Sequence, residues 1–318
     1  MPNCDVNHEH PRPSRLRRPP LLSEGARVAL VAPAGPLRNE LDLNQARDNV
    51  RSFGWEPILG AHVLLRAGYF AGDDAQRAAD LNRALADDSI DAIWCLRGGY
   101  GTMRILDALD YDAVARRPKP VIGYSDITAL HCALASRCEI VSYHGPTARS
   151  PLSDFTRDSF ACALVYGGDS CGTSADARVL RGGTAQGMLA GGNLALLSAL
   201  AGTRFAPRLA DAILVLEDID EAVYRVDRML RQLLLAGLLD DVRAIVFGAC
   251  TNCPEESDDG ARRLDDVIFE VAEALGVPAL VGVPVGHIEN QWTLPLGAPA
   301  ALDADRRTLS VLPHLTIA

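Results

Sequence analysis

The sequence predicts an α/β protein, with an N-terminal doubly wound (Rossmann-like) domain and a second, C-terminal α/β domain. Three observations lead to this prediction. Short apolar runs alternate with segments of helical periodicity from residue 27 onward, which is typical of β-α-β units around a parallel sheet. The chain of 318 residues is too long for one small core. The alternation loosens over residues 151–184, which indicates a connector between two units.

The first half contains candidate strands and helices in alternation. The apolar runs that predict strands lie at 26–32, 56–61, 91–96, 119–124 and 139–144. Apolar residues at i, i+3 and i+4 spacing predict helices at 40–54, 75–87 and 126–136. We therefore expect an N-terminal domain over 23–150. Residues 1–22 are rich in proline and charge without apolar periodicity, so we expect a flexible extension there.

The second half continues the same alternation after the connector, in which we expect one short helix. The segment 185–203 opens this unit, with strands predicted at 212–217, 243–249 and 278–284 and helices at 222–239 and 261–275. We expect a C-terminal domain over 185–318, and no internal repeat is present in the sequence.

Composition and charge limit the classes of partner. Hydrophobic residues make up 48% of the chain and charged residues 23%, as in ordinary globular proteins. The net charge of −10 argues against nucleic acid or an anionic membrane surface as the main partner. No apolar run approaches the roughly 20 residues of a membrane span. A small molecule or a peptide is the expected ligand.

The cysteines predict a reducing compartment. Eight are scattered through the chain, mostly in apolar or helix-like surroundings, so we expect reduced thiols and a cytoplasmic location. Cys250 and Cys253 form the one C-x-x-C pair, without a second pair or a nearby histidine to complete a zinc site, and we interpret it as a loop. His8 and His10 lie in the solvated tail. We expect no metal and no cofactor.

Ser125 in "KPVIGYSDITALH" (119–131) has two interpretations. It can be the N-cap of the helix that begins at Asp126, because serine is a preferred cap. It can also be a nucleophile at a sharp strand-to-helix turn, where the helix N-terminus stabilises a developing oxyanion. The G-x-S-x-G elbow pattern is incomplete, since Ile127 stands where the last glycine would be. These residues alone leave both interpretations open.

The glycine pair in "RGGYG" (97–101) follows another predicted strand. Two successive glycines allow close backbone approach and expose N–H groups, which suits an oxyanion site. A phosphate loop and a plain tight turn are the alternatives, and the phosphate-loop pattern itself is absent.

A general base and an acid have several candidates at strand ends. His144 and His287 each end an apolar run beside glycine, so spacing does not choose between them. His131 falls on the apolar side of a helix, where a core imidazole is expected. Glu217 ends the run "AILVL", but Asp218, Asp220 and Glu221 follow it closely. Serine, acid and histidine in this chain order occur in acyl-transfer triads, although order alone is weak evidence.

At these residues the sequence resembles the LD-carboxypeptidase family of serine peptidases, the muramoyltetrapeptide carboxypeptidases. The resemblance runs from about Gly25 to Gly297. It rests on "VALVAPAGP", "AIWCLRGGYG", "KPVIGYSDITAL", "HGP", "GMLAGGNLALLSALAGT", "ILVLEDIDEAVYRVDRMLRQLLLAG" and "GVPVGHIENQWTLPLGAPAALD", which occur in the family's order.

The resemblance implies a catalytic triad of Ser125, Glu217 and His287 at the interface between the two domains. It also implies an oxyanion hole made by the backbone N–H groups of Asp126 and Gly99. His144 then takes a structural role, with a contact to substrate left open. The family's usual reaction cleaves the L,D-peptide bond between meso-diaminopimelate and the terminal D-alanine of murein tetrapeptides, in peptidoglycan recycling. No metal is required.

The resemblance leaves the substrate contacts least determined. Arg97, Asn193 or the backbone of "AGGN" are candidates for the substrate's terminal carboxylate, and Trp292 lies in a loop that can shape the pocket. One branch of the superfamily cleaves acylated nucleotide-peptide antibiotics and gives self-immunity. Trp292 or Trp94 could serve its aromatic pocket, but packing is the commoner role of tryptophan. A non-catalytic peptide-binding module is the third alternative, and by analogy with the family we expect a homodimer.

Overall fold

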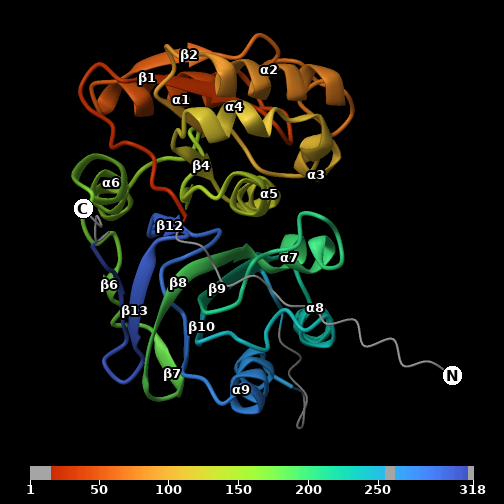
Figure 1. The fold of residues 1–318 in the computed structure, drawn as a ribbon, viewed down its shortest axis with the longest axis vertical. Coiled ribbons are helices and arrows are strands. Elements are labelled where there is room, and N and C mark those ends of the chain that lie inside the picture. The colour runs from red at the N-terminus through yellow and green to blue at the C-terminus, as the bar shows by residue number, and fades with distance from the viewer. Residues whose placement is uncertain (1–15, 255–261, 314–318) are drawn as a thin grey trace, which may run out of the picture.

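The computed structural model describes residues 16–254 and 262–313, which form two sheets one above the other along the long axis of the molecule (Figure 1). One sheet has six strands in the order β12-β5-β4-β3-β1-β2, and the other has eight in the order β6-β14-β13-β8-β9-β10-β11-β7. The predicted α/β class, with an N-terminal doubly wound unit and a second α/β unit, is confirmed.

The N-terminal sheet is parallel from β5 to β2. Its strands are β1 (Arg27–Val31), β2 (Glu56–Leu59), β3 (Ala92–Cys95), β4 (Val121–Gly123) and β5 (Ser142–His144). The strands are short apolar runs, and β1, β3 and β4 are almost wholly buried, as expected where helices cover both faces. The order reverses between β1 and β3, which is the kind of switch point where open α/β sheets bind ligands at the carboxyl ends of their strands.

Helices connect these strands. They are α1 (Glu40–Ser52), α2 (Asp74–Ala86), α3 (Thr102–Ile105), α4 (Tyr111–Arg116) and α5 (Thr128–Cys138). The start of α2 is fixed by a capping box between Asp73 and Gln76. Helix α5 is buried on nearly all sides, because it lies between the two sheets (Figure 1).

The C-terminal sheet combines a parallel centre with antiparallel edges. Its strands are β6 (Gly172–Thr173), β7 (Arg178–Arg181), β8 (Thr184–Asn193), β9 (Ala212–Ile219), β10 (Ala244–Thr251), β11 (Ala279–Val281), β13 (Pro299–Asp303) and β14 (Thr308–Val311). The helices α7 (Leu194–Leu200), α8 (Val223–Leu235) and α9 (Leu264–Leu275) cover one side of it (Figure 1). The connector holds α6 (Asp154–Ala161), continued by η3 (Cys162–Tyr166).

Two features join the halves. Strand β12 (Leu294–Leu296) comes from the second half of the chain but pairs antiparallel with β5 in the N-terminal sheet. One apolar cluster is also continuous from Leu130 of α5 to Leu197 of α7 and Leu216 of β9. The two sheets are therefore held together by a shared core and by a strand that crosses between them.

Three sequence expectations need correction or limits. Residues 16–22 were expected in the flexible extension, but Arg17 pairs with Ile140 and Leu22 is buried, so this part packs on the protein. Residues 1–15, with His8 and His10, lie outside the described residues. The segment "CTNC" was predicted to be a loop with two thiols, but Cys250 and Thr251 belong to β10, and Cys250 and Cys253 form a disulfide. The predicted domain limits stay a prediction. Within 16–254 and 262–313, no helix is long and apolar enough to cross a membrane.

Candidate active site

The residues implied as nucleophile, acid and base come from three segments, at or beyond the carboxyl ends of β4, β9 and β11. Ser125 lies two residues beyond β4, Glu217 lies within β9, and His287 follows β11. The imidazole of His287 packs on the ring of Tyr124, with ring centroids 4.8 Å apart. The residue directly before Ser125 therefore contacts His287, although the two are more than 150 positions apart in the chain.

The backbone at Ser125 forms an elbow. Its φ is +64°, in the left-handed region that non-glycine residues seldom adopt. The short helix η2 (Ser125–Ile127) begins there and leads into α5, and neither helix start has a side-chain cap hydrogen bond. Ser125 therefore does not act as the N-cap in this structure. A strained serine between a strand and a helix is typical of a nucleophile elbow.

The glycine turn after β3 lies against this elbow. A methyl group placed on Gly98 would stand 2.8 Å from Ser125 Cβ and 3.0 Å from its Oγ, so only glycine leaves room beside the hydroxyl. Gly99 follows with φ +110°, another conformation that favours glycine. The segments "RGGYG" and "GYSD" are therefore in direct contact.

Asp126 fixes the turn relative to the elbow. Its carboxylate is fully buried, and Oδ2 accepts a hydrogen bond from the backbone N–H of Thr102 at 2.8 Å. Burial raises the pKa of this carboxyl above its usual value. Because Thr102 directly follows "RGGYG", this bond holds the glycine turn at a set distance from the residue after Ser125.

Glu217 and His287 form a close pair. His287 Nδ1 and Glu217 Oε2 are 2.8 Å apart; the glutamate side chain is fully buried and that of His287 is 17% exposed. Glu217 is enclosed because β9 is a central strand, with Asn193 of β8 as its register partner. Since Nδ1 faces the carboxylate, Nε2 is the nitrogen left to exchange protons with a ligand or with Ser125. Within the described residues, Ser125 and His287 make no direct hydrogen bond.

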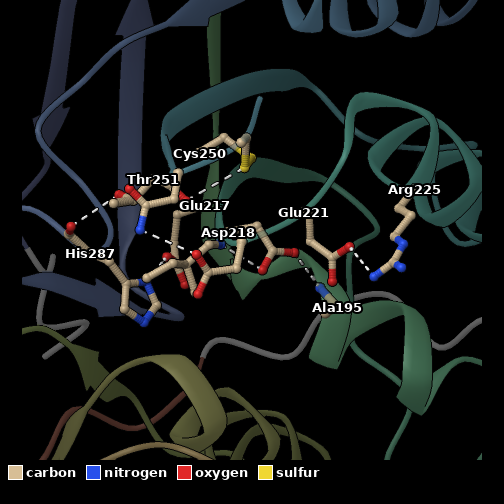
Figure 2. Close-up of a disulfide and its surroundings, with 12 residues drawn as sticks. Ala195, Glu217, Asp218, Glu221, Arg225, Cys250, Thr251 and His287 are labelled. Atoms are coloured by element: carbon tan, nitrogen blue, oxygen red, sulfur yellow. Dashed lines mark hydrogen bonds and ion pairs between the residues drawn. A yellow bond between two sulfur atoms is a disulfide. The ribbon is translucent and has the colours of Figure 1, made fainter. Parts of the chain in front are cut away.

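The loop that carries His287 is tightly packed. Gly286 has φ +120°, and a Cβ there would lie 3.0 Å from Glu217 Cβ. The backbone carbonyl of His287 accepts a hydrogen bond from Thr251 Oγ1 at 3.0 Å, as Figure 2 shows. Thr251 could not be identified from the sequence, because a lone threonine beside an apolar run has no distinguishing signal.

Asp218 points away from the His287 pair, because consecutive residues of a strand face opposite sides of the sheet. Its Oδ1 accepts from Asn193 Nδ2 and its Oδ2 from the backbone N–H of Ala195, each at 2.9 Å. Burial raises the pKa of Asp218 to about 6. Asn193 also caps α7 by accepting from the N–H of Leu196. The amide of Asn193, a candidate for the substrate carboxylate, is thus occupied by contacts within the protein.

Arg97 and Trp292, the other two candidates for substrate contact, differ in how accessible their side chains are. Arg97 is half-buried and donates to the carbonyl of Pro36 at 2.6 Å. Burial and then repulsion from Arg149 and Arg38 lower its pKa, so several arginines lie near one another. Trp292 is 2% exposed and belongs to the apolar core of the C-terminal sheet, so its ring offers almost no surface to a ligand. Its position matches the packing role.

The remaining buried histidines lie behind the elbow. His131 bonds to the carbonyl of Gly123 through Nε2 at 2.9 Å. His144 is fully buried, and no described side chain or backbone group pairs with its ring nitrogens. Burial lowers the pKa of His131 to about 4 and, with added repulsion from His131 and His287, that of His144 to about 3. Both are neutral near pH 7, which suits structural roles.

No group of three or more metal-binding side chains is found over 16–254 and 262–313. What the site does offer is a hydroxyl at an elbow, an imidazole held by a buried carboxylate, and backbone donors on a glycine turn. Such a combination can support nucleophilic attack on an acyl group, with the imidazole as proton carrier.

Comparisons with known proteins agree across both halves. Family models described as the LD-carboxypeptidase N-terminal and C-terminal domains match residues 28–145 and 186–302. A Streptomyces coelicolor protein named as a carboxypeptidase is 42% identical over 312 residues, covering 93% of this chain and 96% of the relative. The murein tetrapeptide carboxypeptidase of Pseudomonas aeruginosa is 37% identical over 294 residues, covering 88% and 94%.

Solved structures share the fold. The muramoyltetrapeptide carboxypeptidase of Oxalobacter formigenes superimposes with a TM-score of 0.80 at 31% identity, over 90% of this chain and 98% of that one. The protein MccF, in complex with glutamyl sulfamoyl guanosine, gives a TM-score of 0.85 at 24% identity, over 95% and 99%. The two-sheet arrangement is therefore common to these structures.

Proposed function

Because this chain belongs to the LD-carboxypeptidase family and is a serine-type LD-carboxypeptidase, we propose that it removes the terminal D-alanine from murein tetrapeptides during peptidoglycan recycling. The bond cleaved is the L,D-peptide bond after meso-diaminopimelate. The observation that carries the proposal is the buried Glu217–His287 pair, 2.8 Å apart, which lies beside the Ser125 elbow. The murein relatives named above support the choice of substrate.

In the proposed first step, Ser125 Oγ attacks the carbonyl carbon of diaminopimelate. His287 Nε2 takes the hydroxyl proton, and Glu217 holds the imidazole by accepting from Nδ1–H. When the tetrahedral intermediate collapses, His287 gives the proton to the nitrogen of D-alanine. The C–N bond breaks, D-alanine leaves, and the remaining peptide is an ester on Ser125.

The oxyanion of this intermediate needs donors on one side of Ser125. We propose the backbone N–H groups of Asp126 and Gly99, because the elbow and the glycine turn adjoin and the Asp126–Thr102 hydrogen bond fixes their spacing. In the second step, water attacks the ester while His287 takes its proton. The acid product then leaves, and Ser125 regains its hydrogen.

The substrate's carboxylates have a cationic counterpart near the glycine turn. Arg97 adjoins Gly98 in sequence, and Arg149 and Arg38 are close enough to lower the pKa of its guanidinium. We propose that Arg97 binds the terminal carboxylate of D-alanine, because arginine forms paired hydrogen bonds with carboxylates. Asn193 and Trp292 are not included, since the first is engaged by Asp218 and the second is buried.

The test is product analysis with defined muropeptides. The protein is incubated with a murein tetrapeptide and, separately, with the matching pentapeptide, and the products are identified by mass spectrometry. The proposal predicts loss of one alanine from the tetrapeptide only. Removal of the last residue from the pentapeptide at an equal or higher rate indicates D,D specificity and contradicts the proposed bond.

A second candidate function is cleavage of acylated nucleotide-peptide antibiotics. The microcin C7 self-immunity protein MccF of Escherichia coli is 28% identical over 279 residues. Two aromatic rings at the glycine turn could receive a base: Tyr100 is 48% exposed and its ring lies 5.9 Å from that of Tyr69. Trp94, in contrast, is fully buried. Faster hydrolysis of an aminoacyl sulfamoyl adenosine than of the murein tetrapeptide would favour this function.

Two further proposals concern the protein's surroundings. A homodimer, tested by sedimentation, follows from the family analogy only. A cytoplasmic location was predicted from the cysteines, and five cysteines are free in the described residues. The Cys250–Cys253 disulfide weakens that argument, because disulfides are rare in reducing compartments. Cell fractionation tests the location.

A further inference from the structure

We propose that Thr251 is a positioning residue for His287, and that the Cys250–Cys253 disulfide keeps Thr251 in place, so that reduction of this disulfide slows turnover. The inference rests on the proposed function, in which His287 is the base. It adds a residue and a redox dependence that the reaction itself does not require.

Thr251 restrains the backbone of His287. Its Oγ1 donates to the His287 carbonyl at 3.0 Å from the last position of β10 (Figure 2). Two residues earlier, the N–H of Ala249 donates to the carbonyl of Val285 at 2.8 Å. The end of β10 therefore holds the loop before and at His287, while Glu217 holds the ring. Without the Thr251 hydrogen bond, the imidazole of His287 keeps its partner Glu217, but the backbone of His287 is less restrained.

The disulfide encloses Thr251. Cys250 and Cys253 are bonded to each other, and only Thr251 and Asn252 lie between them. The disulfide spans the end of β10: the register with β9 shifts between Phe247 and Cys250, pairing resumes at Cys250 and Thr251, and the chain then turns at Asn252, which has φ +55°. A cross-link over four residues limits the conformations open to this turn. After reduction, the turn keeps its pairing with β9 and the hydrogen bonds from Asp220 N–H to the Thr251 carbonyl and from Asn252 Nδ2 to Asp220 Oδ1, but it loses the covalent link that limits its conformations.

The position of this turn explains why a small change there reaches the site. Cys250 is the register partner of Asp218, the neighbour of Glu217 in β9. Figure 2 shows the disulfide, Thr251, Glu217 and His287 as one group of side chains around the ends of β9 and β10. A shift of Thr251 thus moves the backbone of the base relative to a glutamate that is fixed in the sheet.

The redox step is thiol–disulfide exchange with a small dithiol. One thiolate of the dithiol attacks a sulfur of the pair and forms a mixed disulfide, and its second thiolate then displaces that sulfur. The dithiol loses two electrons and becomes a cyclic disulfide. Cys250 and Cys253 gain those electrons and the two protons and become thiols. Both cysteines are partly exposed, so the dithiol can reach them.

The test measures kcat and KM for D-alanine release from the murein tetrapeptide, before and after treatment of the full chain with dithiothreitol. Alkylation and mass spectrometry verify the state of Cys250 and Cys253. We expect reduction to lower kcat about two- to tenfold, the range for one neutral hydrogen bond, with KM changed less than about twofold. Reoxidation should restore kcat.

Three variants locate the effect. Thr251→Val removes the hydroxyl and keeps the shape, so it should show the reduced kcat in both redox states. Thr251→Ser keeps the hydroxyl and should behave as the unchanged protein. The double variant Cys250→Ser with Cys253→Ser should have the lower kcat and no response to dithiothreitol, which also controls for the other cysteines.

Two results would overturn the inference: an unchanged kcat in protein whose pair is demonstrably reduced, or an equal further loss when Thr251→Val is reduced. If the oxidised protein cleaves no peptide at all, the proposed function fails instead. The inference is then decided by the rate at which a fluorophosphonate labels Ser125. That rate should fall on reduction and in Thr251→Val, but not in Thr251→Ser, and unchanged labelling contradicts it.

Discussion

Replacing Glu217 by glutamine tests whether the buried carboxylate stabilises the imidazolium that forms when His287 takes a proton. At the 2.8 Å separation of Oε2 and Nδ1, Coulomb's law with an effective dielectric constant of about 20 gives about 6 kcal/mol. That energy corresponds to about 10⁴-fold in rate. A glutamine oxygen can still accept from Nδ1–H, so we expect kcat to fall about 10³- to 10⁴-fold in Glu217→Gln.

The assay is D-alanine release from the murein tetrapeptide, with kcat and KM measured separately. A matched control exists in the N-terminal unit, where His62 Nδ1 and the buried Asp80 Oδ1 are also 2.8 Å apart. Asp80→Asn removes the same kind of pair away from Ser125. It should change thermal stability but leave kcat within about twofold. KM of Glu217→Gln should change little, because Glu217 does not face the substrate.

A kcat for Glu217→Gln within tenfold of the unchanged protein would refute the reasoning, because the pair would then contribute no more than an ordinary neutral hydrogen bond. An equal loss in Asp80→Asn would also refute it, because the effect would then reflect general destabilisation.

Two further predictions concern the elbow and the buried histidine. Gly98→Ala should lower kcat/KM at least about 100-fold, because the new methyl group would stand 2.8 Å from Ser125 Cβ and 3.0 Å from its Oγ, so that the turn or the elbow must move; normal cleavage by this variant contradicts the placement of the turn. His144 is held neutral by burial, with a pKa of about 3, whereas the unfolded chain binds a proton below its ordinary value of 6.5. His144 should therefore lower the stability of the protein as pH drops from 6.5 toward 3. In His144→Gln, the slope of unfolding free energy against pH, measured by urea denaturation over this range, should be smaller by up to about 1.4 kcal/mol per pH unit. Asp218, with a pKa raised to about 6, has the opposite effect on stability, but it is present in both the unchanged protein and His144→Gln. An unchanged slope in the variant would therefore contradict the prediction.

Much of the fold is predictable because its strands and helices are local in sequence. The run that predicted a strand at 26–32 contains β1, the run at 212–217 lies within β9, and the helix predicted at 40–54 contains α1. The pairing of β12 with the N-terminal sheet could not be predicted. A run of three residues is too short to show the alternation of a strand, and its partner, β5, lies about 150 positions earlier in the chain. Pairing at that distance depends on how the two sheets meet.

The site was predictable to a different degree. Local patterns identified Ser125 and the glycine turn as candidates. They left the role of Ser125 open, because a positive φ at serine cannot be seen in the sequence. The choice of Glu217 and His287 came from the family resemblance and stays a prediction of their roles; the structure shows that His287 Nδ1 and Glu217 Oε2 are 2.8 Å apart. The disulfide was missed because the spacing of Cys250 and Cys253 is equally compatible with two free thiols.

The most direct test of the central claim is the reaction of Ser125 itself. Ser125→Ala should reduce D-alanine release from the murein tetrapeptide by about 10⁴-fold or more, with the fold intact by circular dichroism. In the unchanged protein, rapid quenching followed by mass spectrometry should detect the peptide minus D-alanine as an ester on Ser125. A Ser125→Ala protein that still releases D-alanine at a near-normal rate would contradict the account.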